Sequence, residues 1–396
     1  MDDTVPPRQP GDWRSLWDLD PAVRHLNHGS FGAVPRAVAA EQARLRALVD
    51  RNPVGWFAAL PERVAQARTR MAALLGVDAD RLAFVLNASA GCSVVYHSLL
   101  TRGQVDVLTT NHGYDAVVMG ARRLAERTGG SFRQVAIPLD ADAAEARRIV
   151  RAELHRRPPT LLVIDQLTSA TARALPATEL CQDARELGVL SLVDGAHAPG
   201  VVDPAVCAAA DYWVGNLHKF GCAPHGSAVL VSREPEPDVH PLIDSWGTGL
   251  GFPERFDHHG TSDLTGWLTA PFAWEYLDRE IGWPRLRAYS AELLDDATAL
   301  LADALAPEVG DPVPEVGQPV GPMRLLRLPG RLGSTREEAD GLRIPFLRET
   351  GVACAFTSFD GLGYLRLSAH AYNDLDDYRH LAAVGVPLLR QWADQR

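Results

Sequence analysis

The sequence predicts an α/β protein with a large domain on a seven-stranded, mostly parallel sheet and a smaller α+β domain at the C-terminal end. Three observations support this. Short apolar runs alternate with longer amphipathic segments, which implies crossover connections between parallel strands. The apolar runs are rich in Val, Leu and Ile, as strands buried on both faces are. From Thr265 onward, long helical segments are followed by shorter strand-like runs, which is typical of an α+β domain.

After a Pro-rich arm, the first regular element is a stretch of helical periodicity from about residue 37 to residue 75. The strands of the large domain follow it. They are predicted at residues 82–86, 105–109, 132–138, 161–166, 190–194, 212–215 and 228–231.

The small domain begins near residue 276, where the alternation of strands and helices stops. Its strands are predicted at residues 323–328, 352–356 and 364–368, and a final helix runs to the C-terminus. The Pro- and Gly-rich residues 306–322 are interpreted as a loop within it. The expected division is therefore an N-terminal arm (1–25), a large domain (26–275) and a small domain (276–396).

Composition excludes several classes of function. The 396 residues are 46% hydrophobic and 22% charged, as in ordinary globular proteins. A formal net charge of -11 without a basic run argues against nucleic-acid binding. No run of apolar residues is long enough to span a membrane, and the acidic start matches no secretory or transit signal, so we expect a cytoplasmic protein without membrane partners.

Cysteines and histidines do not suggest a metal centre. The five cysteines are scattered and form no C-x-x-C pair, so neither a disulfide framework nor a zinc ribbon is indicated. His258 and His259 are adjacent, a spacing that does not match metal ligation from one helix face. We expect no metal.

The segment 191–227 carries the strongest indication of chemistry. Asp194 ends an apolar run, where an unpaired carboxylate is costly to bury, so a cationic partner is expected. Lys219 follows a second apolar run and precedes a glycine turn, a setting in which a lysine can form a Schiff base. For an isolated pair, a helix-capping aspartate and a solvated lysine would be the simpler interpretation.

The surrounding motifs resemble those of the class V aminotransferase family of fold-type I PLP (pyridoxal 5′-phosphate) enzymes, most closely its isopenicillin N epimerase-like branch. VGNLHKFGCAPHGS is similar to the lysine motif, which implies Lys219 as the Schiff-base residue and His218 as a neighbour of the cofactor phosphate. VDGAH is similar to the cofactor-ring motif, which implies that Asp194 pairs with the ring nitrogen and His197 reaches the phenolic oxygen. One departure is His225, where many relatives have Lys or Arg.

Two upstream motifs extend the resemblance. LNASAGCSVV resembles the phosphate loop, and Ser89 with free N–H groups of Ala90 and Gly91 at a helix N-terminus would form an anion site. A plain N-cap serine is the alternative. TNHGYDA lies where the family stacks an aromatic ring on the cofactor, so Tyr114 is the first candidate and His112 the second.

The resemblance also implies residues from a partner subunit and residues for the substrate. HHGTSD resembles the loop that a partner contributes to the phosphate site, which implies Gly260 and Thr261 acting across a homodimer. YLRLSAHAYN is similar to the substrate-carboxylate motif, which implies Arg366 as a bidentate fork, although a surface arginine on an edge strand is the simpler alternative. LNHGSFGAVP resembles the opening motif, which places Asn27 and His28 near substrate.

Several reactions remain open. Lys219 is the expected general base on one face of the substrate, and an epimerase needs a second base, for which Tyr114, His112 or His28 are candidates. Cys354 lies in an apolar run, so we expect it to pack rather than to act as a desulfurase nucleophile.

Because relatives in lincosamide antibiotic pathways process cysteine S-conjugates, β-elimination by a C–S lyase is ranked first. Decarboxylating or oxidative deamination of such a conjugate and epimerisation follow. Simple transamination and an inactive regulator with a PLP fold rank lower.

Overall fold

The computed structural model describes residues 10–395, so the first nine residues of the expected N-terminal arm lie outside it. Contacts divide the chain into two units. Among the described residues, the first contains 10–36, 170–173 and 275–395, and the second contains 37–169 and 174–274. The main boundary falls beside the expected one at residue 275, but residues 26–36 belong with the C-terminal unit and not with the large domain.

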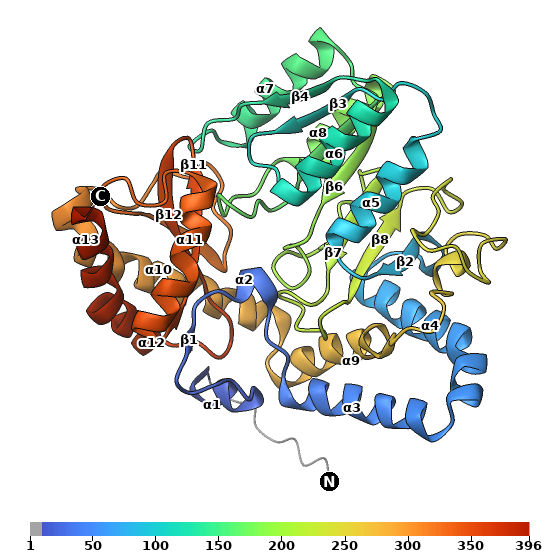
Figure 1. Ribbon diagram of the computed structural model, residues 1–396, viewed down its shortest axis with the longest axis horizontal. Helices are drawn as coiled ribbons and strands as arrows, with labels where there is room; N and C mark the ends of the chain where they lie inside the picture. Colours follow the sequence, from blue (N-terminus) through green and yellow to red (C-terminus); the bar gives the residue numbers. More distant parts are fainter. Residues whose placement is uncertain (1–9, 396) are drawn as a thin grey trace. The chain divides into compact units, whose positions relative to one another are not determined.

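The second unit contains the seven-stranded sheet, as predicted. The strand order is β2-β8-β7-β6-β5-β3-β4 (Figure 1). Their bounds are β2 (Leu82–Val85), β3 (Val107–Thr110), β4 (Phe132–Val135), β5 (Leu161–Asp165), β6 (Leu190–Asp194), β7 (Tyr212–Asn216) and β8 (Ala228–Ser232). Pairing is parallel from β7 through β4, and only β8 runs antiparallel to its neighbours β7 and β2.

Helices of the second unit connect and cover these strands. They are α3 (Arg36–Arg51), α4 (Pro53–Leu75), α5 (Ala88–Leu99), α6 (Asp115–Thr128), α7 (Ala143–Arg156), α8 (Ala177–Glu186) and α9 (Thr265–Glu280), with 3-10 turns η2 (Ala79–Arg81) and η3 (Glu254–Phe256). Helices α5 and α6 pack on each other, and Figure 1 shows them in front of the strands; α7 and α8 form another packed pair. The expected helical stretch 37–75 is split in two, because Asn52 caps α4 and Pro53 occupies its first turn.

The first unit has its own small sheets and helices. Its elements are α1 (Pro10–Trp13), η1 (Arg14–Leu16), β1 (Arg24–His25), α2 (His28–Phe31), α10 (Trp283–Val309), β9 (Met323–Arg327), α11 (Arg336–Thr350), β10 (Val352–Ala353), β11 (Ala355–Phe359), β12 (Leu362–Ser368), α12 (Leu375–His380), the π-helical turn η4 (Leu381–Gly385) and α13 (Val386–Asp394). Strands β11, β12 and β9 form an antiparallel sheet, and β1 pairs with β10 in parallel. The predicted strand 352–356 is two strands, and the predicted loop begins only after α10 ends at Val309.

Each unit has an apolar core of its own. In the second unit the core joins α5 and α6 to the inner strands, with Val95, Leu192 and Val214 fully or almost fully buried. In the first unit it joins α10 and α11 to β12, with Leu301 and Phe346 fully buried. Within residues 10–395, no helix is both long enough and apolar enough to cross a membrane.

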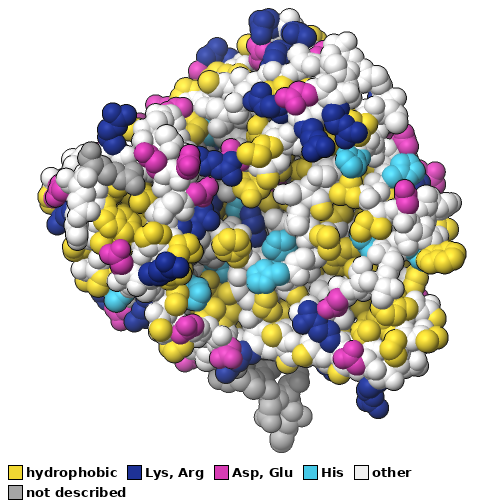
Figure 2. Space-filling model, viewed as in Figure 1, with side chains coloured by type: hydrophobic (Ala, Val, Ile, Leu, Met, Phe, Trp, Pro, Cys, Tyr) yellow, Lys and Arg dark blue, Asp and Glu magenta, His cyan; other side chains and the backbone are white. Residues whose placement is uncertain are grey.

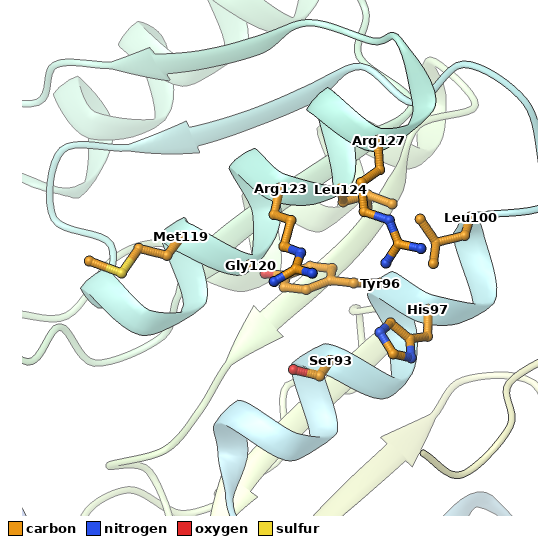
Figure 3. A pocket seen from close by; sticks show the side chains of 9 residues that line it. All are labelled: Ser93, Tyr96, His97, Leu100, Met119, Gly120, Arg123, Leu124 and Arg127. Atoms are coloured by element: carbon orange, nitrogen blue, oxygen red, sulfur yellow. The ribbon is translucent and has the colours of Figure 1, made fainter. Parts of the chain in front are cut away.

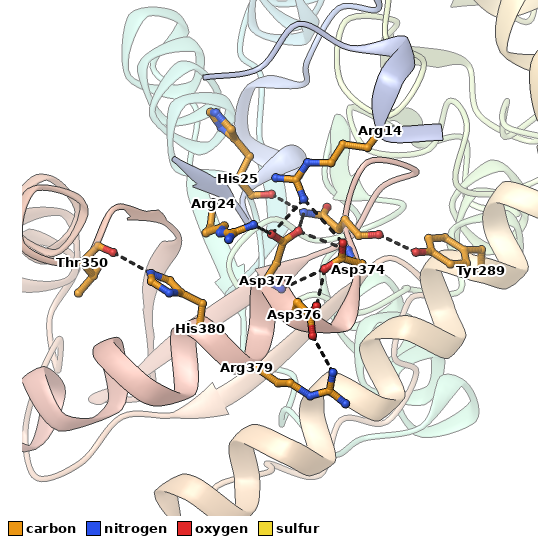
Figure 4. Close-up of polar contacts among 11 residues, drawn as sticks. Arg14, Arg24, His25, Tyr289, Thr350, Asp374, Asp376, Asp377, Arg379 and His380 are labelled. Atoms are coloured by element: carbon orange, nitrogen blue, oxygen red, sulfur yellow. Dashed lines mark hydrogen bonds and ion pairs between the residues drawn. The ribbon is translucent and has the colours of Figure 1, made fainter. Parts of the chain in front are cut away.

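A buried carboxylate fastens the N-terminal segment of the first unit to α12. Asp377 accepts hydrogen bonds from Arg14 at 3.3 Å and Arg24 at 3.0 Å, and from the side-chain amide of Asn373 at 3.2 Å (Figure 4). Its side chain is 1% exposed. The neighbouring Asp376 is 74% exposed; its carboxylate pairs with Arg379, and its backbone N–H donates to Asp374 at 3.0 Å (Figure 4).

Replacement of Asp377 by Ala should lower the free energy of unfolding by about 2 kcal/mol, because charged hydrogen bonds are lost around a buried position. Urea unfolding of the full chain measures this. Asp376→Ala is the matched control and should change the free energy by less than about 0.5 kcal/mol, since an exposed ion pair contributes little. Equal effects of the two changes would show that Asp377 does not fasten this segment.

Candidate active site

Two buried carboxylates lie side by side at the carboxyl edge of the parallel sheet. Asp165 ends β5, Asp194 ends β6, and the two are register partners. Each is 3% exposed. Asp194 accepts a hydrogen bond from the Ala196 N–H at 2.9 Å, and Asp165 accepts one from the Tyr114 N–H. Burial raises the pKa of both carboxyls, while the charge of Lys219 acts in the opposite direction on both.

Asp165 was missed by the sequence analysis, although the reasoning that identified Asp194 applies to it unchanged. Both residues end an apolar run that forms a strand buried along nearly its whole length. Parallel neighbours present their carboxyl ends at one edge, so a second acid at the same position doubles the negative charge there. A cationic ligand at this edge would be stabilised by both side chains.

Lys219, His197 and Tyr114 come together near this edge. Lys219 Nζ lies 3.1 Å from His197 Nε2 and 6.0 Å from the centre of the Tyr114 ring. Lys219 is half-buried, His197 is buried, and Tyr114 is 41% exposed. A lysine amine, an imidazole and an aromatic face are thus within reach of one small ligand.

Trp213 packs next to this edge of the sheet, and its indole ring explains why Gly195 and Gly215 have no side chain. Its indole N–H donates to Gln166 Oε1 at 2.8 Å. A Cβ at Gly195 would lie 2.2 Å from the indole Nε1, and one at Gly215 would lie 2.1 Å from a ring carbon. The glycine in the VDGAH motif is therefore required by packing against Trp213.

His112, the second candidate for stacking on the cofactor ring, is in contact with a backbone carbonyl. It is buried, and its Nε2 lies 3.0 Å from the carbonyl oxygen of Ile137. That contact engages one of its two ring nitrogens. Tyr114, which is exposed and close to Lys219, therefore remains the better placed of the two.

The N-terminus of α5 differs in detail from the expected anion site. The N–H of Ala90 donates to the Asn87 side chain at 2.9 Å, and the N–H of Gly91 donates to the Asn87 carbonyl at 3.0 Å. These two groups are therefore not free, because Asn87 caps the helix. Ser89 remains in the first turn, and Asn216 at the end of β7 accepts from the Ala88 N–H at 2.8 Å.

His218 is held by a backbone carbonyl. Its Nδ1 lies 2.8 Å from the Ser227 oxygen. Burial lowers the pKa of His218 to about 4, and the charges of Lys219 and His225 act in the same direction. His218 is therefore neutral at pH 7: its Nδ1–H donates to the Ser227 carbonyl, and its Nε2 is an acceptor.

The loop before α9 contains the residues expected to act across a dimer. Gly260 and Thr261 are both exposed, and Gly260 has a φ of +68°, a left-handed conformation that favours glycine. Gly260 and Thr261 are thus accessible within this chain. His225, the departure from the family pattern, is also exposed.

In the first unit, the predicted substrate residues Asn27 and Arg366 are in direct contact. Arg366, on β12, donates to Asn27 Oδ1 at 3.2 Å and to Ser30 Oγ at 2.8 Å. Ser30 Oγ in turn donates to Asn27 Oδ1 at 2.7 Å. Arg366 is 3% exposed, so the alternative of a surface arginine is wrong. Ser30 was not among the predicted residues.

His28 belongs to a buried group of rings. It stacks on His370 with ring centres 4.0 Å apart, and its Nδ1 lies 2.9 Å from the Tyr372 hydroxyl. His370 and Tyr372 were not predicted as site residues, although both lie in the YLRLSAHAYN motif. Contacts between the two motifs hold this group in place, since the Ser368 N–H donates to the Leu26 carbonyl at 3.0 Å.

A separate cavity of about 380 Å³ lies between α5 and α6 and contains none of the predicted site residues (Figure 3). Tyr96, His97, Arg123 and Arg127 are among its lining residues. Figure 2 shows basic side chains and a histidine gathered over this region. It is distinct from the edge of the sheet where Asp194 and Lys219 lie.

Residues 32–315 match the family model for class V aminotransferases. The chain belongs to the class V aminotransferase family. It is 32% identical over 315 residues to isopenicillin N epimerase of Streptomyces clavuligerus, covering 74% of this chain and 79% of that protein. It is 22% identical over 384 residues to hercynylcysteine sulfoxide lyase of Schizosaccharomyces pombe, covering 92% of this chain and 94% of the other.

The class V fold is also seen in solved structures. A variant of C-DES with glycine covalently linked to its PLP cofactor matches with a TM-score of 0.76 at 19% identity, covering 91% of this chain and 95% of that one. In another structure the same protein is described as a cystine C–S lyase. At this identity the likeness shows the fold, which is therefore the fold-type I architecture predicted from the sequence.

PLP is the cofactor of this class V protein, and the described residues fit it. The buried pair Asp165 and Asp194 suits a protonated ring nitrogen, because two carboxylates without a bound cation are costly at this depth. When bound, the cofactor withdraws electrons from the substrate carbon attached to nitrogen. The Ser89 hydroxyl, in the first turn of α5, is the group suited to its phosphate.

The neutral state of His218 predicts a pH dependence of stability. Its pKa is about 4 in the folded chain and near 6.5 when unfolded, so the unfolded chain binds more protons between these values. Stability from this residue is thus complete above pH 6.5 and decreases as the pH falls toward 4, by about 3 kcal/mol in total.

Urea unfolding between pH 7.5 and pH 4.5 tests this by comparing the chain with its His218→Asn variant. The variant should lose less stability on acidification. The exposed His155 provides a matched control, since His155→Asn should leave the pH slope unchanged. Identical slopes for all three proteins would mean that His218 is not held neutral.

Proposed function

We propose that this PLP-dependent enzyme is a C–S lyase that performs β-elimination on a cysteine S-conjugate in secondary metabolism. Lyase or epimerase is the activity class of the chain, as its class V relatives include an isopenicillin N epimerase and a hercynylcysteine sulfoxide lyase. The interpretation as an inactive regulator gains no support from these relatives. The choice between elimination and epimerisation rests on the chain's own residues.

The observation that carries the proposal is one well-placed base in a chain whose described cysteines are all buried. Lys219 Nζ, with His197 at 3.1 Å, is positioned to take the proton from the substrate Cα. A desulfurase needs a mobile nucleophilic cysteine in addition. In the described chain all five cysteines are buried, and burial raises the pKa of Cys354, so its thiol stays protonated and packed.

The proposed reaction breaks the Cα–H bond and the Cβ–S bond of the substrate. Loss of the Cα proton and cleavage of the Cβ–S bond release a thiol, and hydrolysis of the remaining three-carbon unit gives pyruvate and ammonia. Arg366, with Asn27 and Ser30 around its guanidinium, is proposed to bind the substrate carboxylate as a fork. His28 is proposed to lie near the substrate as well.

The proposal also assigns roles toward the cofactor to the remaining residues of the site. Lys219 is proposed to carry the cofactor, Asp194 to pair with the ring nitrogen, and His197 to reach its phenolic oxygen. Tyr114 is proposed to stack on the ring. Gly260 and Thr261 are proposed to complete the phosphate site of a second copy, which makes the cytoplasmic homodimer the active form.

Epimerisation is the second candidate because the chain is 32% identical to isopenicillin N epimerase. It requires a base on the face opposite Lys219. Tyr114 is exposed and 6.0 Å from Lys219 Nζ, measured to its ring centre, whereas an imidazole nitrogen of His112 is engaged by Ile137. Tyr114 is therefore the residue on which an epimerase mechanism would depend.

A product assay separates these reactions. The purified holoenzyme is incubated with cysteine S-conjugates and amino acids, and pyruvate, ammonia, carbon dioxide and D-enantiomer are measured. Pyruvate with ammonia in equal amounts is the expected result. Carbon dioxide with an aldehyde would instead establish decarboxylation, and a changed enantiomer ratio alone would establish epimerisation. Lys219→Ala is the control and should lose both activity and the visible absorbance of lysine-bound PLP.

Arg366→Ala should raise KM for the substrate by about 10- to 100-fold, because a charged, bidentate contact to the carboxylate is lost. Arg366→Lys keeps the charge without the planar fork and should recover only part of this loss. Circular dichroism checks that both variants are folded. An unchanged KM in a folded Arg366→Ala protein would remove Arg366 from the substrate site.

A further inference from the structure

Two cysteines of the second unit contact each other away from the residues discussed so far. Cys181 lies on α8, and Cys207 lies in the loop between β6 and β7. Both are buried, and their thiols are hydrogen-bonded to each other. No disulfide joins them in the described chain.

The surroundings of the Cys207 sulfur are rich in hydrogen-bond donors. The Thr178 hydroxyl lies 3.7 Å from it, and the backbone N–H groups of Ala209 and Ala210 donate to it. The Cys181 thiol donates as well. Four donors around one sulfur stabilise a negative charge there.

The hydrogen bonds change the pKa values of the two cysteines in opposite directions. The hydrogen bond from Cys181, followed by the other donors, lowers the pKa of Cys207 to about 6 despite its burial. The same contact raises the pKa of Cys181. The hydrogen bonds thus favour the thiolate on Cys207 and the thiol on Cys181, the division needed for an attacking and a resolving cysteine.

A small cavity gives access to Cys207. It measures about 170 Å³, and Cys207, Trp213, Arg81 and Arg233 are among its lining residues. A cavity needs only about 10 to 15 Å³ to hold a water molecule, so hydrogen peroxide fits easily. The cavity touches none of Cys92, Cys222 and Cys354 in the described chain.

We propose that Cys207 and Cys181 are a peroxide-sensitive thiol pair, with Cys207 the attacking cysteine and Cys181 the resolving one. The Cys207 thiolate attacks one oxygen of hydrogen peroxide, which forms a sulfenic acid and releases hydroxide. The Cys181 sulfur then attacks the Cys207 sulfur and displaces its hydroxyl group, which leaves as water with the Cys181 proton. The two sulfurs supply two electrons, and peroxide is reduced to water.

The proposal is independent of the lyase chemistry. Cys181 also forms a hydrogen bond with Ser191, near the amino end of β6, whereas Asp194 ends the same strand at the carboxyl edge. No residue assigned to cofactor or substrate takes part in the oxidation. Failure of the lyase proposal therefore leaves this one standing, and the reverse also holds.

Site-resolved oxidation of the full-length holoenzyme tests the proposal. The protein is treated with hydrogen peroxide from pH 5 to pH 8, and each cysteine is followed by peptide mass spectrometry. Cys207 should react at least about tenfold faster than Cys92, Cys222 and Cys354, which serve as internal controls because burial raises the pKa of each. The final product should be a Cys181–Cys207 disulfide, and the rate should rise with a midpoint near pH 6.

Variants separate the two roles. In Cys181→Ser the Cys207 sulfenic acid should accumulate and be trapped by dimedone, and in Cys207→Ser neither sulfenic acid nor disulfide should form. Cys354→Ser should behave as the unmodified chain does. Equal oxidation of all five cysteines, initial oxidation of Cys181, or absence of the disulfide would each overturn the proposal. The wild-type measurement decides the matter even where a variant does not fold.

Discussion

The burial of two carboxylates at the end of neighbouring parallel strands is the constraint on which the site depends. Asp165 and Asp194 are register partners on β5 and β6, and both are almost fully buried. Two such charges repel each other and lose their hydration, so their ionised state requires a positive group close by. The charge of Lys219 lowers the pKa of both carboxyls, and a cationic ring at this edge would be stabilised by them as well.

Other features of the second unit hold that edge in shape. Trp213 is wedged where Gly195 and Gly215 leave room for its indole, and its N–H is bound by Gln166, the residue after Asp165. Asn216 connects the end of β7 to the first turn of α5. The polar groups of the site thus stand on strands and helix ends that packing and hydrogen bonds connect, which favours a fixed geometry.

Much of this was predictable from the sequence because it depends on local pattern. The buried parallel strands appear as apolar runs, so the sheet, the position of Asp194 and the strand 190–194 were predicted correctly. Asp165 was not predicted because it lies outside the family motifs, although its position after a run of buried residues is equivalent to that of Asp194. The engaged N–H groups of Ala90 and Gly91 depend on the rotamer of Asn87, which no sequence pattern specifies.

The unpredicted part is the pairing of distant segments. Strand β1 joins β10, and the opening motif lies against β12, through contacts between residues more than 300 positions apart. This has a consequence for the order of events on the ribosome. A nascent chain can complete the seven-stranded sheet from residues already synthesised, but residues 24–30 must wait, without their partners, until the last strands emerge. Asn27 and Arg366 therefore meet only when synthesis is nearly finished, and a chain that terminates before β12 lacks this contact.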